Sequence, residues 1–203
     1  MKKIALDKEK ENHFIGAWQL DDIELCNEII NFFNQDNNNH KHISLLEKTK
    51  SSEKSDFIRL IISSNRIKDE NLEIIEKYIE NLMISYQEFI NDWDFFQNFE
   101  RIYLGDISID KFLLSGHCKK YHCDRDSIDN SHKMLSWITF LNDTDENEGI
   151  LNFKYLNINI RPKKGLTLIW PSDWTHTYNE GEIKNNEKYV IRGNIHYPDT
   201  LIK

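Results

Sequence analysis

The hydrophobic spacing changes near residue 100, and this change limits the possible folds more than any other feature of the chain. Before it, apolar residues recur every three or four positions from Leu72 to Trp93, the spacing of one buried helix face. A shorter run from Leu25 to Phe33 follows an acidic, cap-like start. After residue 100, short apolar or alternating runs are separated by polar turns, which is typical of β-strands. Helices followed by many short strands predict an α+β fold, a β sandwich or barrel with helices on one outer face.

The length of the chain predicts one domain. Its 203 residues match the usual domain size of about 100–200 residues. We expect residues 1–100 to form a mainly helical support and residues 101–203 to form the β core. Residues 34–56 are nearly all polar, so we expect a long loop or lid there. The predicted strands are 101–104, 107–114, 135–141, 151–160, 166–170 and 189–197.

The composition excludes several classes of protein. A mean hydropathy of −0.65 and the lack of an apolar run of ~18 residues argue against a membrane span. The net charge of −8, from 26 basic and 34 acidic residues, argues against general nucleic-acid binding. Three cysteines and a start without an apolar signal segment predict a protein of the reducing cytoplasm. The oligomeric state stays open.

A short motif in the second half has the chemistry of a metal site. His122 and Asp124 are two positions apart, so on an extended segment both side chains point to the same side. His176, which follows the apolar run 166–170, is the best candidate for a third ligand. Two imidazoles and one carboxylate with open positions are the ligand set of non-haem Fe(II) oxygenases. A chance His-x-Asp pattern in a structural or interaction protein is the alternative.

Two cations follow on the last predicted strand. Lys188 and Arg192 are four positions apart, so they share one face with Val190. Cations on the inner face of a core strand are costly unless an anion meets them there. They predict an anion site, such as one for the distal carboxylate of a dicarboxylate co-substrate. A solvated edge strand is the alternative interpretation.

Together these motifs resemble one family. Residues 100–197 resemble the Fe(II)/2-oxoglutarate-dependent dioxygenases of the prolyl-4-hydroxylase-like group, which have a double-stranded β-helix (jelly-roll) core. The matching stretches are 111–124, ending in the His-x-Asp motif, 139–153, 160–171 with Pro162 and Gly165, His176, and 188–191. The resemblance implies a jelly-roll core with an N-terminal helical layer packed on it.

The resemblance also implies roles for single residues. His122, Asp124 and His176 would hold the iron, and Lys188, with Arg192 as the alternative, would bind the distal carboxylate of 2-oxoglutarate. Thr139 would replace a hydroxyl that the family supplies from a tyrosine, because this chain has Phe112 in that place. The segment from His176 to Lys188 is about two residues longer than the family pattern. For this reason Arg192 remains the alternative to Lys188 for binding the distal carboxylate.

The function implied is that of an oxidoreductase. Fe(II) would be the metal, and 2-oxoglutarate and dioxygen would be co-substrates. The enzyme would hydroxylate a prolyl or other peptidyl side chain and release succinate and CO2. A non-catalytic, cupin-like metal-binding jelly roll is the first alternative. A dioxygenase acting on a small molecule or a nucleic acid is the second.

Overall fold

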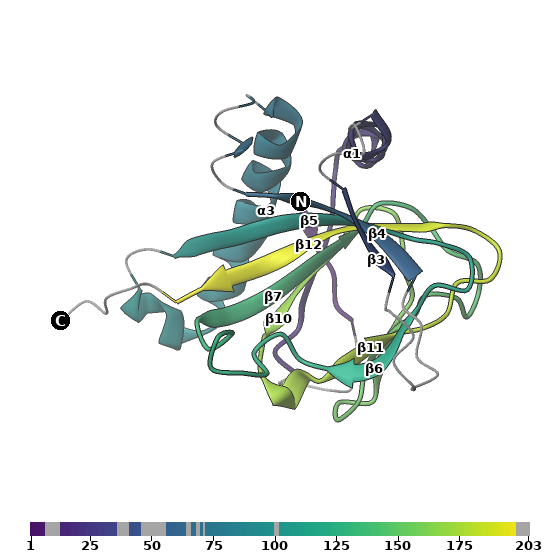
Figure 1. Ribbon diagram of the computed structural model, residues 1–203. Helices are drawn as coiled ribbons and strands as arrows, with labels where there is room; N and C mark the ends of the chain where they lie inside the picture. Colours follow the sequence, from purple (N-terminus) through teal and green to yellow (C-terminus); the bar gives the residue numbers. More distant parts are fainter. Residues whose placement is uncertain are drawn as a thin grey trace.

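Two antiparallel sheets pack face to face in the computed structural model, with helices on the outer side of the larger sheet (Figure 1). The structure describes residues 1–6, 13–35, 41–45, 56–63, 66–67, 70, 72–99 and 102–197. The larger sheet has the strand order β1-β2-β10-β7-β12-β5-β4-β3. Its strands are β1 Lys2–Lys3, β2 Gly16–Gln19, β3 Lys41–Leu45, β4 Asp56–Ile62, β5 Tyr103–Phe112, β7 Lys133–Phe140, β10 Leu166–Pro171 and β12 Lys188–His196.

The smaller sheet closes the other side of the core. It has the order β6-β11-β8-β9, and its strands are β6 Cys118–His122, β8 Leu151–Phe153, β9 Ile158–Ile160 and β11 Tyr178–Glu180. Side chains of both sheets form one apolar cluster between them, in which Phe112, Phe140 and Val190 meet Leu151 and Phe153. This packing places one face of β12 and one face of β11 toward each other inside the molecule.

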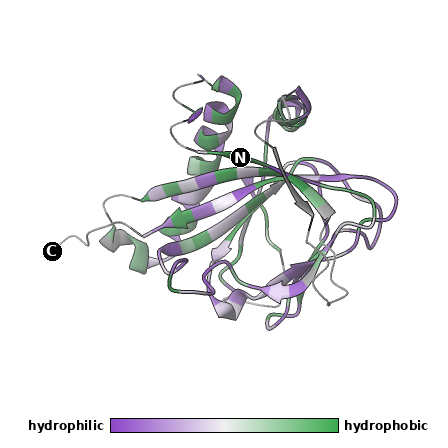
Figure 2. Cartoon of the chain, in the orientation of Figure 1, coloured by the Kyte–Doolittle hydropathy of each residue, from purple (hydrophilic) through white to green (hydrophobic). Residues whose placement is uncertain are grey.

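Both predicted helices form, as α1 (Glu24–Gln35) and α3 (Glu73–Asn91). Their apolar stripes belong to a second cluster, on the other face of the larger sheet. The Tyr78 ring of α3 lies 5.8 Å from that of Trp137 on β7, and Trp18 of β2 donates a hydrogen bond of 2.7 Å to Glu88. The helices carry hydrophobic and hydrophilic bands in alternation, as one buried face requires (Figure 2). Among the described residues, no helix combines the length and apolar character needed to span a membrane.

The first half supplies more than the predicted helical support, because it also provides β1 to β4 of the larger sheet. β2 pairs with β10 and β4 pairs with β5, so strands from the start of the chain extend the sheet on both sides. β2 is four residues long, which is too short for a two-residue period to stand out. β4 buries Leu60 and Ile62 in the cluster beneath the helices, but these two positions form too short an alternation to be recognised after a long polar segment.

The prediction of a long loop at 34–56 is wrong in part. Residues 41–45 form β3, which pairs with β4 from Lys41 opposite Leu60 to Leu45 opposite Asp56. Residues 34 and 35 end α1, and Asp56 begins β4. Residues 36–40 and 46–55 lie outside the described part of the chain.

The strand pattern of the second half is confirmed with three changes. The two runs predicted between 101 and 114 form one strand, β5. The run 151–160 folds into the hairpin of β8 and β9, with a turn in which Asn157 has a φ of 51°. β6 and β11, which carry His122 and Tyr178, were not predicted as strands.

Candidate active site

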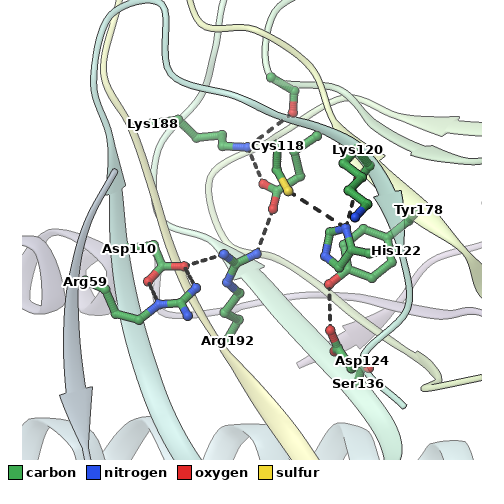
Figure 3. Close-up of polar contacts among 12 residues, drawn as sticks. Arg59, Asp110, Cys118, Lys120, His122, Asp124, Ser136, Tyr178, Lys188 and Arg192 are labelled. Atoms are coloured by element: carbon green, nitrogen blue, oxygen red, sulfur yellow. Dashed lines mark hydrogen bonds and ion pairs between the residues drawn. The ribbon is translucent and has the colours of Figure 1, made fainter. Parts of the chain in front are cut away.

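A cavity of about 490 Å³ is lined by residues of the larger sheet and by residues of β6 and β11 in the smaller one. His122 at the end of β6, Asp124 just after it and Tyr178 of β11 all line this cavity. β12 contributes Arg192 and Asn194. The structure therefore brings two of the three predicted metal ligands, and one of the two predicted cations, to one place (Figure 3).

The His122 ring is oriented by its own strand. Its Nδ1 lies 3.0 Å from the carbonyl oxygen of Lys120, and since a carbonyl only accepts, Nδ1 carries the proton and donates. In the neutral ring Nε2 then holds the free lone pair. Burial opposes the charged form of His122, but the neighbouring Cys118, the Lys120 carbonyl and Asp124 raise its pKa above the usual value. A backbone carbonyl on the second ring nitrogen is the usual support of a metal-binding histidine.

The Asp124 carboxylate is held by three donors. The Ser136 hydroxyl donates to Oδ2 at 2.5 Å, and the Asn194 amide donates to the same oxygen at 2.9 Å. The Tyr178 hydroxyl donates to Oδ1 at 3.1 Å. Ser136 and Asn194 come from neighbouring strands, β7 and β12, so the sheet itself fixes the carboxylate. Such support orients a carboxylate toward a ligand in the cavity.

His176 lies elsewhere, and both of its ring nitrogens are used. It ends a short 3₁₀ turn (η3, Trp174–His176), is buried, and does not line the cavity. Its Nε2 donates to the carbonyl of His13 at 2.9 Å, and its Nδ1 lies 2.9 Å from the Thr175 hydroxyl. Burial lowers the pKa of His176, which favours the neutral ring. His176 thus fastens the segment before β2 to the core.

Tyr178 lies next to both His122 and Asp124. In the β6–β11 pair it lies directly opposite His122, and the two ring centroids are 4.5 Å apart. Burial raises the pKa of Tyr178 well above its usual value, so its hydroxyl keeps its proton. Within the described residues, no three His, Cys, Asp or Glu side chains are grouped so that they could hold a metal ion.

Lys188 and Arg192 do share one face, and both reach the same carboxylate. Arg192 Nη1 lies 2.7 Å from Glu180 Oε1, and Lys188 donates a short hydrogen bond to Glu180 Oε2 (Figure 3). The Lys188 ammonium also lies 4.1 Å from the centre of the Phe112 ring. The anion that these two cations contact is therefore the Glu180 carboxylate of the chain itself.

Thr139 does not line the cavity. It lies on the helix side of β7, where its hydroxyl is 2.7 Å from the Tyr78 hydroxyl and 2.7 Å from that of Thr167. Its neighbours Ile138 and Phe140 point into the jelly roll, so strand alternation turns Thr139 outward. The predicted role of Thr139 in holding a co-substrate is not compatible with this position.

The metal ion and the co-substrate implied by the sequence resemblance do not fit the site equally well. His122 and Asp124 offer an imidazole nitrogen and a carboxylate, which fit a divalent transition-metal ion with open positions for water or substrate. His132 and His196 also line the cavity, but among the described residues no two histidines and one carboxylate are grouped so that they could hold a metal ion. 2-Oxoglutarate does not fit as the side chains stand, because Glu180 already pairs with Lys188 and Arg192.

Three important residues escaped the sequence analysis, namely Asp110, Tyr178 and Glu180. Tyr178 and Glu180 are two positions apart, so they share a face of β11, but a three-residue strand has too short a pattern to reveal this. Asp110 occupies an inward position of β5, in an alternating run that reads as an ordinary half-buried strand. An acidic residue on the inner face of a core strand is the signal that could have identified it.

Solved structures with this architecture were found by comparison. A viral collagen prolyl hydroxylase from Paramecium bursaria Chlorella virus-1, in complex with 2-oxoglutarate, is 15% identical with a TM-score of 0.67, covering 93% of this chain and 98% of that one. A prolyl-4-hydroxylase from Pseudomonas putida is 14% identical with a TM-score of 0.68, covering 92% and 94%. A prolyl hydroxylase from Trichoplax adhaerens, bound to a peptide of hypoxia-inducible factor, is 12% identical with a TM-score of 0.64, covering 91% and 84%.

Comparison of the sequence alone does not show this likeness. No family model matches it, and no curated protein matches it. The likeness is therefore one of three-dimensional structure, and it extends over nearly the whole chain. This chain has the jelly-roll fold of the prolyl hydroxylases.

Proposed function

We propose that the chain is a metal-dependent oxygenase whose reaction centre lies at His122 and Asp124. The observation that supports this most directly is the orientation of the two side chains toward one cavity, each held by its other polar atoms. Preorganised imidazole and carboxylate donors with open positions are suited to a redox-active divalent ion. The fold of the prolyl hydroxylases agrees with the same chemistry.

The chain's own residues would contribute ligands, orientation and a partly apolar wall. Fe(II), when bound, would supply the activation of dioxygen. Ser136 and Asn194 would keep the Asp124 carboxylate in place, and the Trp170 side chain, which belongs to the cluster between the two sheets, would limit access of water to the cavity. Tyr178 would retain its proton and continue to donate to Asp124.

We propose a prolyl or other peptidyl side chain as the substrate. A volume of about 490 Å³ is in the range of roughly 300–1,000 Å³ of ligand pockets. Two of the similar structures act on or hold peptides, one being a collagen prolyl hydroxylase and the other a complex with a peptide. His132 and Lys133 line the same cavity, where a bound peptide would contact them.

Metal titration tests the proposed centre. Co(II), followed by its visible absorption, is added anaerobically to the wild type and to His122→Ala, Asp124→Ala and His176→Asn. We expect the first two variants to lose binding. His132→Ala, which removes another cavity histidine, is the matched control and should bind as the wild type does. Loss of binding in a folded His176→Asn variant would instead show that His176 moves to become a ligand.

A non-catalytic, metal-binding jelly roll is the second candidate. Tyr178 opposite His122 and the pairing of Glu180 with both cations favour it, since each removes a feature that the sequence resemblance implies. Incubation of the Fe(II)-loaded protein with proline-containing peptides and dioxygen separates the two candidates, with 2-oxoglutarate in one arm and ascorbate in the other as the donor of the two electrons that insertion of one oxygen atom requires. A peptide mass increased by one oxygen atom supports the oxygenase. Metal binding without any such increase supports the non-catalytic protein.

A further inference from the structure

A row of alternating charges crosses the interior beside the cavity. Arg59 of β4 forms two hydrogen bonds with Asp110 of β5, at 2.6 and 2.7 Å. Asp110 Oδ2 lies 2.5 Å from Arg192 Nη2, and Arg192 continues to Glu180, which Lys188 contacts from the other side (Figure 3). The row contains three cations and two carboxylates, and it joins the larger sheet to β11 of the smaller one.

The Glu180 carboxylate neutralises both cations of β12. Its side chain and that of Lys188 are fully buried, and Arg192 is 16% exposed. Burial would raise the pKa of Glu180, but Lys188 and Arg192 lower it to about 2, so the carboxylate stays charged. Without it, Lys188 would retain, among the described residues, only the Gly149 carbonyl at 3.5 Å and the Phe112 ring. A buried ammonium in that state requires another anion.

Arg192 connects the Glu180 carboxylate to the cavity of the proposed centre. Arg192 lines the cavity together with His122 and Asp124, and Glu180 is two residues from Tyr178 on the same strand. A carboxylate that enters the cavity and extends toward Lys188 would therefore meet Glu180 in its place. Two carboxylates cannot share one buried pair of cations without strong repulsion.

We propose that Glu180 is an intramolecular competitor that keeps dicarboxylates such as 2-oxoglutarate away from the Lys188–Arg192 pair. The inference rests on the proposed function, because it concerns the anion site beside the proposed metal centre. It assigns a specificity-determining role to Glu180. A dicarboxylate gains access to the two cations only when the Glu180 carboxylate is displaced or removed.

The test is binding of 2-oxoglutarate and of glutarate to metal-free protein, measured by calorimetry in the presence of a chelator. Glu180→Ala removes the carboxylate and leaves space for another, and we expect it to bind both compounds at least 10-fold more tightly than the wild type. Glu182→Ala, a glutamate two residues away, is the matched control and should behave as the wild type does. Lys188→Met added to Glu180→Ala should abolish the gain.

Equal affinity of the wild type and a folded Glu180→Ala variant would overturn the proposal. If Glu180→Ala does not fold alone, it is refolded with and without glutarate. Recovery of the fold only with glutarate supports the proposal, and failure in both conditions contradicts it. Because no metal is present, these results do not depend on whether His122 and Asp124 bind a metal ion. The Co(II) titration fails or succeeds separately.

Discussion

Tyr178 lies directly opposite His122 in the β6–β11 pair, with ring centroids 4.5 Å apart. Its hydroxyl also donates to Asp124, so a phenol completes the polar side of the cavity next to the imidazole and the carboxylate. A neutral phenol is a weak metal ligand compared with a second imidazole. If His122 and Asp124 bind a metal ion as proposed, the residue at position 178 should influence its affinity.

Replacing this phenol by an imidazole should strengthen metal binding. Tyr178→His places a second imidazole opposite His122 and beside Asp124, which produces the ligand set of non-haem iron sites. We expect at least a 10-fold lower Kd for Co(II) in an anaerobic titration. Tyr178→Phe, which keeps the ring, and Tyr155→His, which adds an exposed histidine, should not tighten binding. An unchanged Kd in a folded Tyr178→His variant would show that position 178 does not face the metal.

The side chains that hold Asp124 should influence metal affinity without touching the metal. Asn194→Ala removes a hydrogen bond of 2.9 Å to Asp124 Oδ2. Loss of such a supporting contact typically weakens metal binding roughly 10–100-fold, and the same Co(II) titration measures it. Asn159→Ala, at an exposed position of β9, is the matched control. Equal affinities of the two variants would count against Asp124 as a ligand.

The buried carboxylate Glu180 should make stability depend on acid pH. Its pKa is about 2 in the folded protein against an ordinary value of 4.5, so it stabilises the fold above pH 4.5. This contribution is lost as the pH falls from 4.5 toward 2. Between pH 6 and pH 3 the wild type should lose roughly 2 kcal/mol more than Glu180→Gln. Urea unfolding at both pH values measures the difference, and parallel losses in the two proteins would refute it.

Thr139 should matter for stability and not for ligand binding. Its hydroxyl links those of Tyr78 and Thr167 at the contact of α3 with the larger sheet. Thr139→Val leaves two buried hydroxyls with one partner fewer, so we expect a loss of about 1–3 kcal/mol in the free energy of unfolding. Co(II) affinity should not change. A weakened metal site with unchanged stability would mean that Thr139 acts in the cavity after all.

Local patterns determined much of the fold. The apolar stripe from Leu72 to Phe89 identified α3, and the runs around Ile109, Trp137 and Val190 identified three central strands of the larger sheet. These features are readable because the backbone repeats every 3.6 residues in a helix and every two residues in a strand. Very short strands, such as β2 and β11, contain too few such repeats to be recognised.

Spacing along the chain predicts which residues can share a face: His122 with Asp124, and Lys188 with Arg192. What each pair contacts follows from the way the two sheets pack. The pairing of β6 with β11 places Tyr178, and not His176, opposite His122, and the packing of β11 against β12 brings Glu180 to both cations. Spacing within a strand follows from backbone geometry, which is local. The partner across a cavity depends on the register and packing of strands that are distant in the chain.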